Sequence, residues 1–120
     1  MRSATLLLWV LAVALLVPRP AVSESNSLCA DLASIYVDFA TKRDGGLTEE
    51  QQKKDLEKRL LAELDAFPND RERVEFKYAV QLRTIWDVYK HPTKSPEQIR
   101  QMVLAKCSIT KEGKIHFLGL

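Results

Sequence analysis

Apolar residues recur every three or four positions in four stretches of this chain, which is the spacing of amphipathic helices. The first predicted helix covers residues 27–44. Ser27 can cap its start, and Gly45-Gly46 can end it because glycine readily adopts a left-handed conformation. Its apolar face carries Cys29, Leu32, Ala33, Tyr36, Phe39, Ala40 and Arg43. The pattern predicts a helix that buries one side, with the long Arg43 side chain reaching the rim.

The next two predicted helices are separated by the turn residues 67–70. The second begins at Thr48, which forms a capping box with Gln51. Its first half, residues 49–57, is almost wholly polar, so we expect it to project into solvent. The third, residues 70–90, is apolar over most of its circumference and should lie centrally, in contact with the other three helices. Its apolar positions are Val74, Phe76, Tyr78, Ala79, Val80, Leu82, Ile85, Trp86 and Tyr89.

The fourth helix has the clearest start signal in the chain. Ser95 can act as its N-cap, Pro96 fits the first helical position and Gln98 completes a capping box. Beyond this helix, residues 108–120 alternate polar and apolar side chains around a glycine. This segment is predicted to form a small hairpin or a loose tail.

Cys29 and Cys107 are the only two cysteines of the chain, 78 positions apart. Both fall on apolar helix faces, and two cysteines behind an export signal are typical of one structural disulfide. Closing a loop of this length lowers the conformational entropy of the unfolded chain, which stabilises the folded protein by about 4 kcal/mol. The sequence therefore predicts an all-α fold: a small four-helix bundle whose first and last helices are joined by a disulfide.

Residues 1–23 have the three parts of a secretory signal: Arg2, an apolar run at residues 5–17 and small residues before Glu24. The apolar run is shorter than the roughly 20 residues of a membrane span. We therefore predict cleavage after Ser23, a helical domain at 24–107, a C-terminal tail at 108–120 and no stable membrane span after cleavage. The location would be the periplasm or the extracellular space.

The full chain has a formal net charge of +2, but Arg2 and Arg19 both belong to the predicted signal. The exported chain would therefore be neutral. This balance argues against a general nucleic-acid binder and against a polybasic membrane binder, both of which need an excess of basic residues.

The sequence offers little that could catalyse a reaction. It has no nucleophile elbow, zinc-protease or phosphate-loop motif, and it has two histidines, His91 and His116. His91 ends the third predicted helix, where its protonated ring would suit the helix dipole. Asp87 lies four positions before it and could pair with it, which leaves a hydrolase dyad as a minor hypothesis. We predict no enzyme activity, no metal and no cofactor.

The candidate contact residues are Trp86, Tyr89 and His91 at the end of the third helix, and Phe117 in the tail. Such residues are enriched at interface hot spots, although ordinary core packing is the simpler interpretation of Trp86 and Tyr89. We expect a non-enzymatic inhibitor, adaptor or effector that acts by protein–protein contact with an envelope or extracellular protein. The alternative is a carrier of a small apolar ligand held between the helices by Trp86, Tyr78 and Phe76.

Overall fold

The computed structural model describes residues 22–120, so all but the last two residues of the predicted signal lie outside the described residues. Four α-helices make up most of this region: α2 (Val22–Asp44), α3 (Glu49–Ala66), α4 (Arg71–Lys90) and α5 (Pro96–Lys106). A 3₁₀ turn, η1 (Pro68–Asp70), links α3 to α4, and two short strands, β1 (Ser108–Ile109) and β2 (Ile115–His116), follow α5. The predicted four-helix architecture is confirmed. None of the described helices is both long and apolar enough to cross a membrane.

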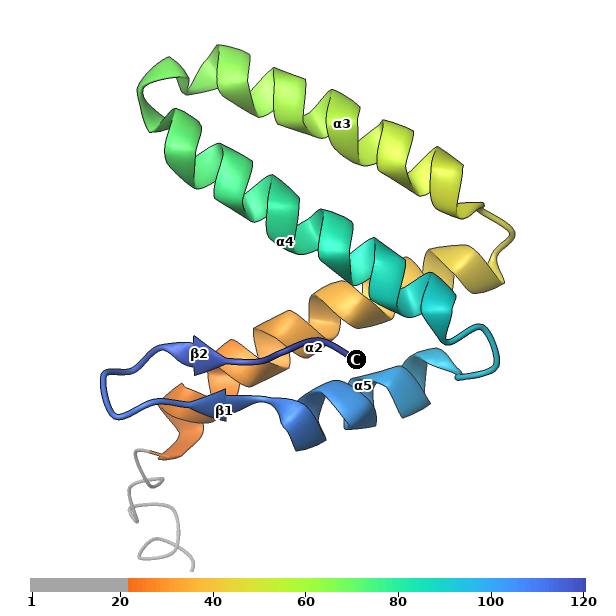
Figure 1. Ribbon diagram of the computed structural model, residues 1–120, viewed down its shortest axis with the longest axis vertical. Coiled ribbons are helices and arrows are strands. Elements are labelled where there is room, and N and C mark those ends of the chain that lie inside the picture. Colours follow the sequence, from red (N-terminus) through yellow and green to blue (C-terminus); the bar gives the residue numbers. More distant parts are fainter. Residues whose placement is uncertain (1–21) are drawn as a thin grey trace, which may run out of the picture.

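The helices form two pairs that meet at one corner (Figure 1). α2 lies beside α5, and this pair is called the base. α3 and α4 form an antiparallel hairpin, called the arm, which extends away from the base and contacts it where the C-terminal half of α4 packs on α2.

Local sequence signals set the helix boundaries. Both predicted capping boxes are present. The main-chain amide of Gln51 donates to the Thr48 hydroxyl at 3.1 Å, and the main-chain amide of Gln98 donates to the Ser95 hydroxyl at 3.1 Å. α2 ends at Asp44, and Gly46 just beyond it has a φ of 103°, in the left-handed region that glycine favours. The Leu47 amide then donates to the Lys42 carbonyl at 3.1 Å, as expected for a glycine-terminated helix.

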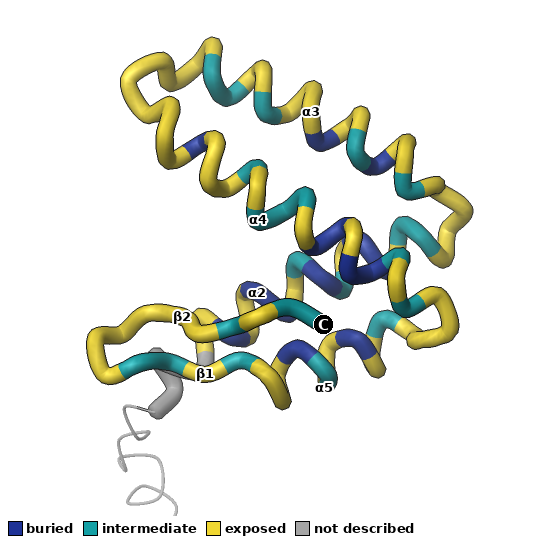
Figure 2. Tube along the Cα trace, viewed as in Figure 1, coloured by how far each residue is buried: buried dark blue, intermediate teal, exposed yellow. Residues whose placement is uncertain are grey.

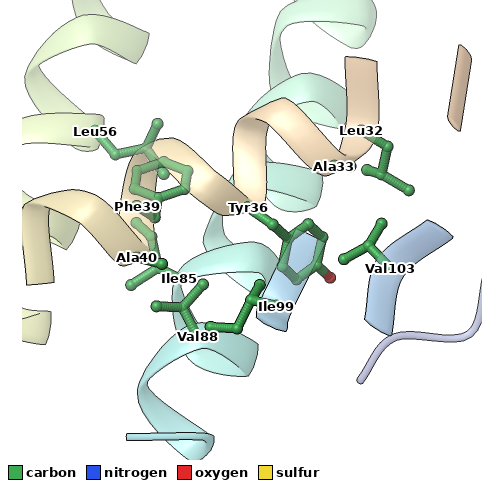
Figure 3. Packing of buried hydrophobic residues seen from close by; sticks show 10 residues of the cluster. All are labelled: Leu32, Ala33, Tyr36, Phe39, Ala40, Leu56, Ile85, Val88, Ile99 and Val103. Atoms are coloured by element: carbon green, nitrogen blue, oxygen red, sulfur yellow. The ribbon is translucent and has the colours of Figure 1, made fainter. Parts of the chain in front are cut away.

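The core lies where α2, α5 and the C-terminal half of α4 meet (Figure 2). Half of its members come from α2, while α3 contributes only Leu56 (Figure 3). The buried cluster consists of Leu32, Ala33, Tyr36, Phe39, Ala40, Leu56, Ile85, Val88, Ile99 and Val103. The base and the adjacent end of α4 therefore supply most of the hydrophobic stabilisation of the described fold.

The arm differs from the sequence expectation in two places. Phe76 and Trp86, expected to widen the buried face of α4, are 72% and 42% exposed. On α3, Gln52 is buried within the half expected to face solvent, where its side-chain amide donates to the Phe39 carbonyl at 3.1 Å. α4 therefore has more apolar residues than its neighbours cover. Near the start of α3, the buried Gln52 side chain bonds α3 to α2.

Arg43 ties the end of α4 to α2. One guanidinium nitrogen donates to the carbonyls of Val88 and His91, both at 3.0 Å, and the other to the Lys94 carbonyl at 2.6 Å. The Val88 carbonyl belongs to the last turn of α4, and the His91 and Lys94 carbonyls belong to the loop that follows it. His91 is the C-cap residue of α4, and its main-chain amide donates to the Val88 carbonyl at 3.2 Å. Arg43, 45 positions from Val88 in the sequence, adds a side-chain donor to the same carbonyl.

The predicted disulfide between Cys29 and Cys107 is confirmed. It joins α2 to the residue that ends α5, with the two Cα atoms 5.8 Å apart. Beyond it the chain forms the hairpin, with Ser108 opposite His116 and Ile109 opposite Ile115. The disulfide thus links the two helices of the base, α2 and α5, and fixes the start of the C-terminal segment.

Replacing both cysteines, Cys29→Ala with Cys107→Ala, should lower the free energy of unfolding by up to about 4 kcal/mol, because the unfolded chain regains the freedom of a long loop. Urea unfolding followed by circular dichroism measures the loss, with the wild-type protein in reductant as the matched control. An unchanged midpoint in both samples would contradict a stabilising role for the disulfide.

Candidate functional site

The exposed side of α4 carries an apolar and basic stripe. Phe76, Ala79, Arg83, Trp86 and Lys90 follow each other at intervals of three or four residues, so they share one face of the helix. All five are exposed, while Val74, Thr84, Ile85, Asp87 and Val88 of the same helix are buried. This α4 stripe is therefore a surface feature of the arm and not part of the core.

A groove of about 690 Å³ runs between this side of α4 and α3. Its floor is apolar and comes from α4: Tyr78, Ala79, Leu82 and Trp86. Its rim is charged and comes mostly from α3: Glu50, Lys53, Lys54 and Glu57, with Arg83 on the opposite side. An apolar floor with a charged rim is the usual composition of a binding surface, and we call this feature the arm groove.

Two basic side chains hold the indole of Trp86. The guanidinium carbon of Arg83 lies 4.5 Å from the ring centroid, and the Lys90 Nζ lies 4.4 Å from it. Both distances are well within the range of a cation–π interaction. Two positive charges therefore lie against this large exposed aromatic ring.

A second, smaller hollow of about 310 Å³ lies on the other side of the α4 stripe. Val80 and Phe117 line it, together with Leu118, which is 84% exposed. It shares Ala79 and Arg83 with the arm groove. The two hollows therefore form one continuous surface on either side of α4.

Asp87 lies beneath this surface and is fully buried. Its carboxylate accepts a hydrogen bond from the Tyr36 hydroxyl at 2.6 Å, one from Arg83 Nε at 3.1 Å and one from the Leu120 amide at 3.3 Å. Burial, together with the hydrogen bond to Asp87, raises the pKa of Tyr36 far above its ordinary value near 10. Asp87 therefore joins α2, α4 and the C-terminal segment.

The four predicted contact residues are not gathered on one surface. Tyr89 is half-buried: its hydroxyl donates to the Leu47 carbonyl at 2.5 Å and accepts from the Gln52 side chain at 2.7 Å. Phe117 packs edge-on against the Tyr36 ring, with centroids 5.7 Å apart. Only Trp86 among the four is classed as exposed.

Asp87 and His91 both bond to the C-terminal segment. His91 Nε2 lies 3.3 Å from the Leu120 main-chain oxygen, while Asp87 takes the amide of the same residue. This geometry gives both residues a structural role in holding the segment. Within residues 22–120, no cluster of three or more His, Cys, Asp or Glu side chains is placed to hold a metal ion.

Comparison with known proteins gives no match to a protein-family model, a curated protein or a solved structure. Trp86 together with the arm groove is the most distinctive surface feature of residues 22–120.

The raised pKa of Tyr36 predicts how stability depends on alkaline pH. The Tyr36 contribution is fully present below about pH 10, where the unfolded tyrosine titrates, and is lost as pH rises toward the higher native pKa. Urea unfolding of the wild type and Tyr36→Phe at neutral and alkaline pH measures this. The variant should start less stable by about 1–3 kcal/mol, because Asp87 loses a donor, and should lose less than the wild type above pH 10. Parallel losses in the two proteins would contradict the assignment.

Proposed function

We propose that this protein is a small exported, non-enzymatic binding protein that acts by protein–protein contact through the arm groove. The observation that carries the proposal is Trp86: a large aromatic side chain, 42% exposed, held by two cations over an apolar floor. Tryptophan and arginine are enriched among the residues that dominate binding energy at protein interfaces.

The proposal places the protein in the periplasm or outside the cell, where an inhibitor, an adaptor or an effector would meet its partner. A structural disulfide supports an oxidising compartment, since such bonds persist there and are rare in the cytosol. The predicted secretory signal at residues 1–23 agrees with that location.

A second candidate function, the carrier of a small apolar ligand, is favoured by the volume of the arm groove. About 690 Å³ is within the range of small-molecule sites, and Tyr78 and Trp86 line it as the sequence suggested. Phe76 is not among the lining residues, and the groove is open to solvent and lined by the two helices of the arm alone. An open groove leaves much of a small ligand exposed to water, whereas a protein partner can cover the whole groove. We therefore place the carrier second.

Trp86→Ala should weaken partner capture by about tenfold or more, because the anchor of the groove is lost. The test is affinity capture from envelope or culture extract with equal amounts of folded protein, followed by quantification of each captured species. Leu104→Ala is the matched control, since Leu104 is an exposed apolar residue of α5, 38% accessible and outside the groove. Equal capture by both variants would refute the assignment of the groove.

A further inference from the structure

We propose that the arm groove binds an acidic amphipathic α-helix of the partner protein, laid along α4 with an apolar side chain against Trp86. The inference rests on the proposed function, because it names the chemistry of the partner that the same surface accepts. Three properties of the groove carry it: the nature of its walls, the distribution of its charges and its open side.

The walls of the groove favour a helical occupant. Its lining residues all belong to α3 and α4, whose main-chain groups are bonded within their own helices. An extended peptide would lay its amides over the apolar floor without partners, which costs free energy for each unpaired group. A helix satisfies its own main chain and can present an apolar stripe to such a groove.

The charges of the groove favour an acidic occupant. The α3 rim is balanced, with two glutamates and two lysines, and Lys53 already pairs with Glu49 at 3.1 Å. The excess positive charge lies on α4, where Arg83 and Lys90 both lie over the Trp86 ring. Arg83 already pairs with Asp87, so Lys90 is the cation most available to a partner. Lys90 is not a lining residue, but it borders the groove through its contact with Trp86. Carboxylates beside the apolar anchor of the partner would meet this charge in a partly desolvated place.

The groove is open to an approaching helix. α2 packs on the side of α4 that carries the buried Thr84 and Val88, whereas Trp86 and Lys90 are exposed. Ala79 and Trp86 are seven residues apart, or about 10.5 Å along the helix. A partner helix would therefore match the floor with apolar residues at intervals of three, four and seven.

The test uses two synthetic four-turn helical peptides with the same apolar stripe, one with glutamates along both flanks and one with lysines. Fluorescence anisotropy of each labelled peptide against the folded, oxidised protein gives its affinity. The glutamate peptide should bind about tenfold more tightly at low salt, and the difference should shrink as salt screens the charges. Equal affinities, or no binding of either peptide, would overturn the inference.

Lys90→Glu should remove the preference for the glutamate peptide, whereas Lys111→Glu, the same charge change at an exposed position outside the groove, should leave it intact. Sedimentation of the free protein completes the design. If the free protein is a dimer and Lys90→Glu dissociates it, the groove binds a second copy of this chain, and the inference is overturned. If Trp86→Ala still abolishes partner capture while neither peptide binds, the proposed function stands and only the acidic helix is wrong.

Discussion

The buried carboxylate of Asp87 is the interaction on which the rest of the described structure depends. A charge with no exposure to solvent is costly unless donors surround it, and here three donors do so. They come from α2, α4 and the C-terminal segment, so satisfying one charge fixes how three parts of the chain meet. The disulfide restrains the unfolded chain, but Asp87 selects the arrangement of the folded one.

The same carboxylate also shapes the surface above it through Arg83. That side chain donates to Asp87 and lies over the Trp86 ring, so it links a buried charge to an exposed aromatic. Gly119 allows this, because a Cβ there would lie 3.0 Å from an Arg83 nitrogen and 3.2 Å from an Asp87 oxygen. Its φ of 95° is also in the left-handed region that glycine favours. The tail thus leaves room for Arg83 beside Asp87 and contributes no lining residue to the groove.

Signals within a few residues of one another made the helices and most of their boundaries predictable, as at the Thr48 and Ser95 capping boxes. The start of the first helix was wrong: α2 begins at Val22, ahead of the predicted cap at Ser27. The disulfide followed from counting cysteines. What could not be predicted depends on residues distant in sequence: Asp87 meets Tyr36 from 51 positions away. Periodicity also shows that α4 is apolar around most of its circumference, but not which arc its neighbours cover, so the exposure of Trp86 became visible only in the fold. The arm groove could not be predicted, because its position depends on which side of α4 its neighbours cover.

The position of Trp86 matters for the proposed binding at the arm groove, because the arm itself is weakly packed. Toward its tip the arm has little buried surface, with Val74 as its one buried apolar residue outside the core cluster. Such a hairpin has low local stability, and a partner that bound only there would have to order it first. Trp86 instead lies one residue before Asp87, at the end that the base holds rigid. A partner that anchors at Trp86 and continues along the floor would therefore gain its first contacts without an ordering cost, and its later contacts would stabilise the arm by covering apolar surface that the free protein leaves exposed.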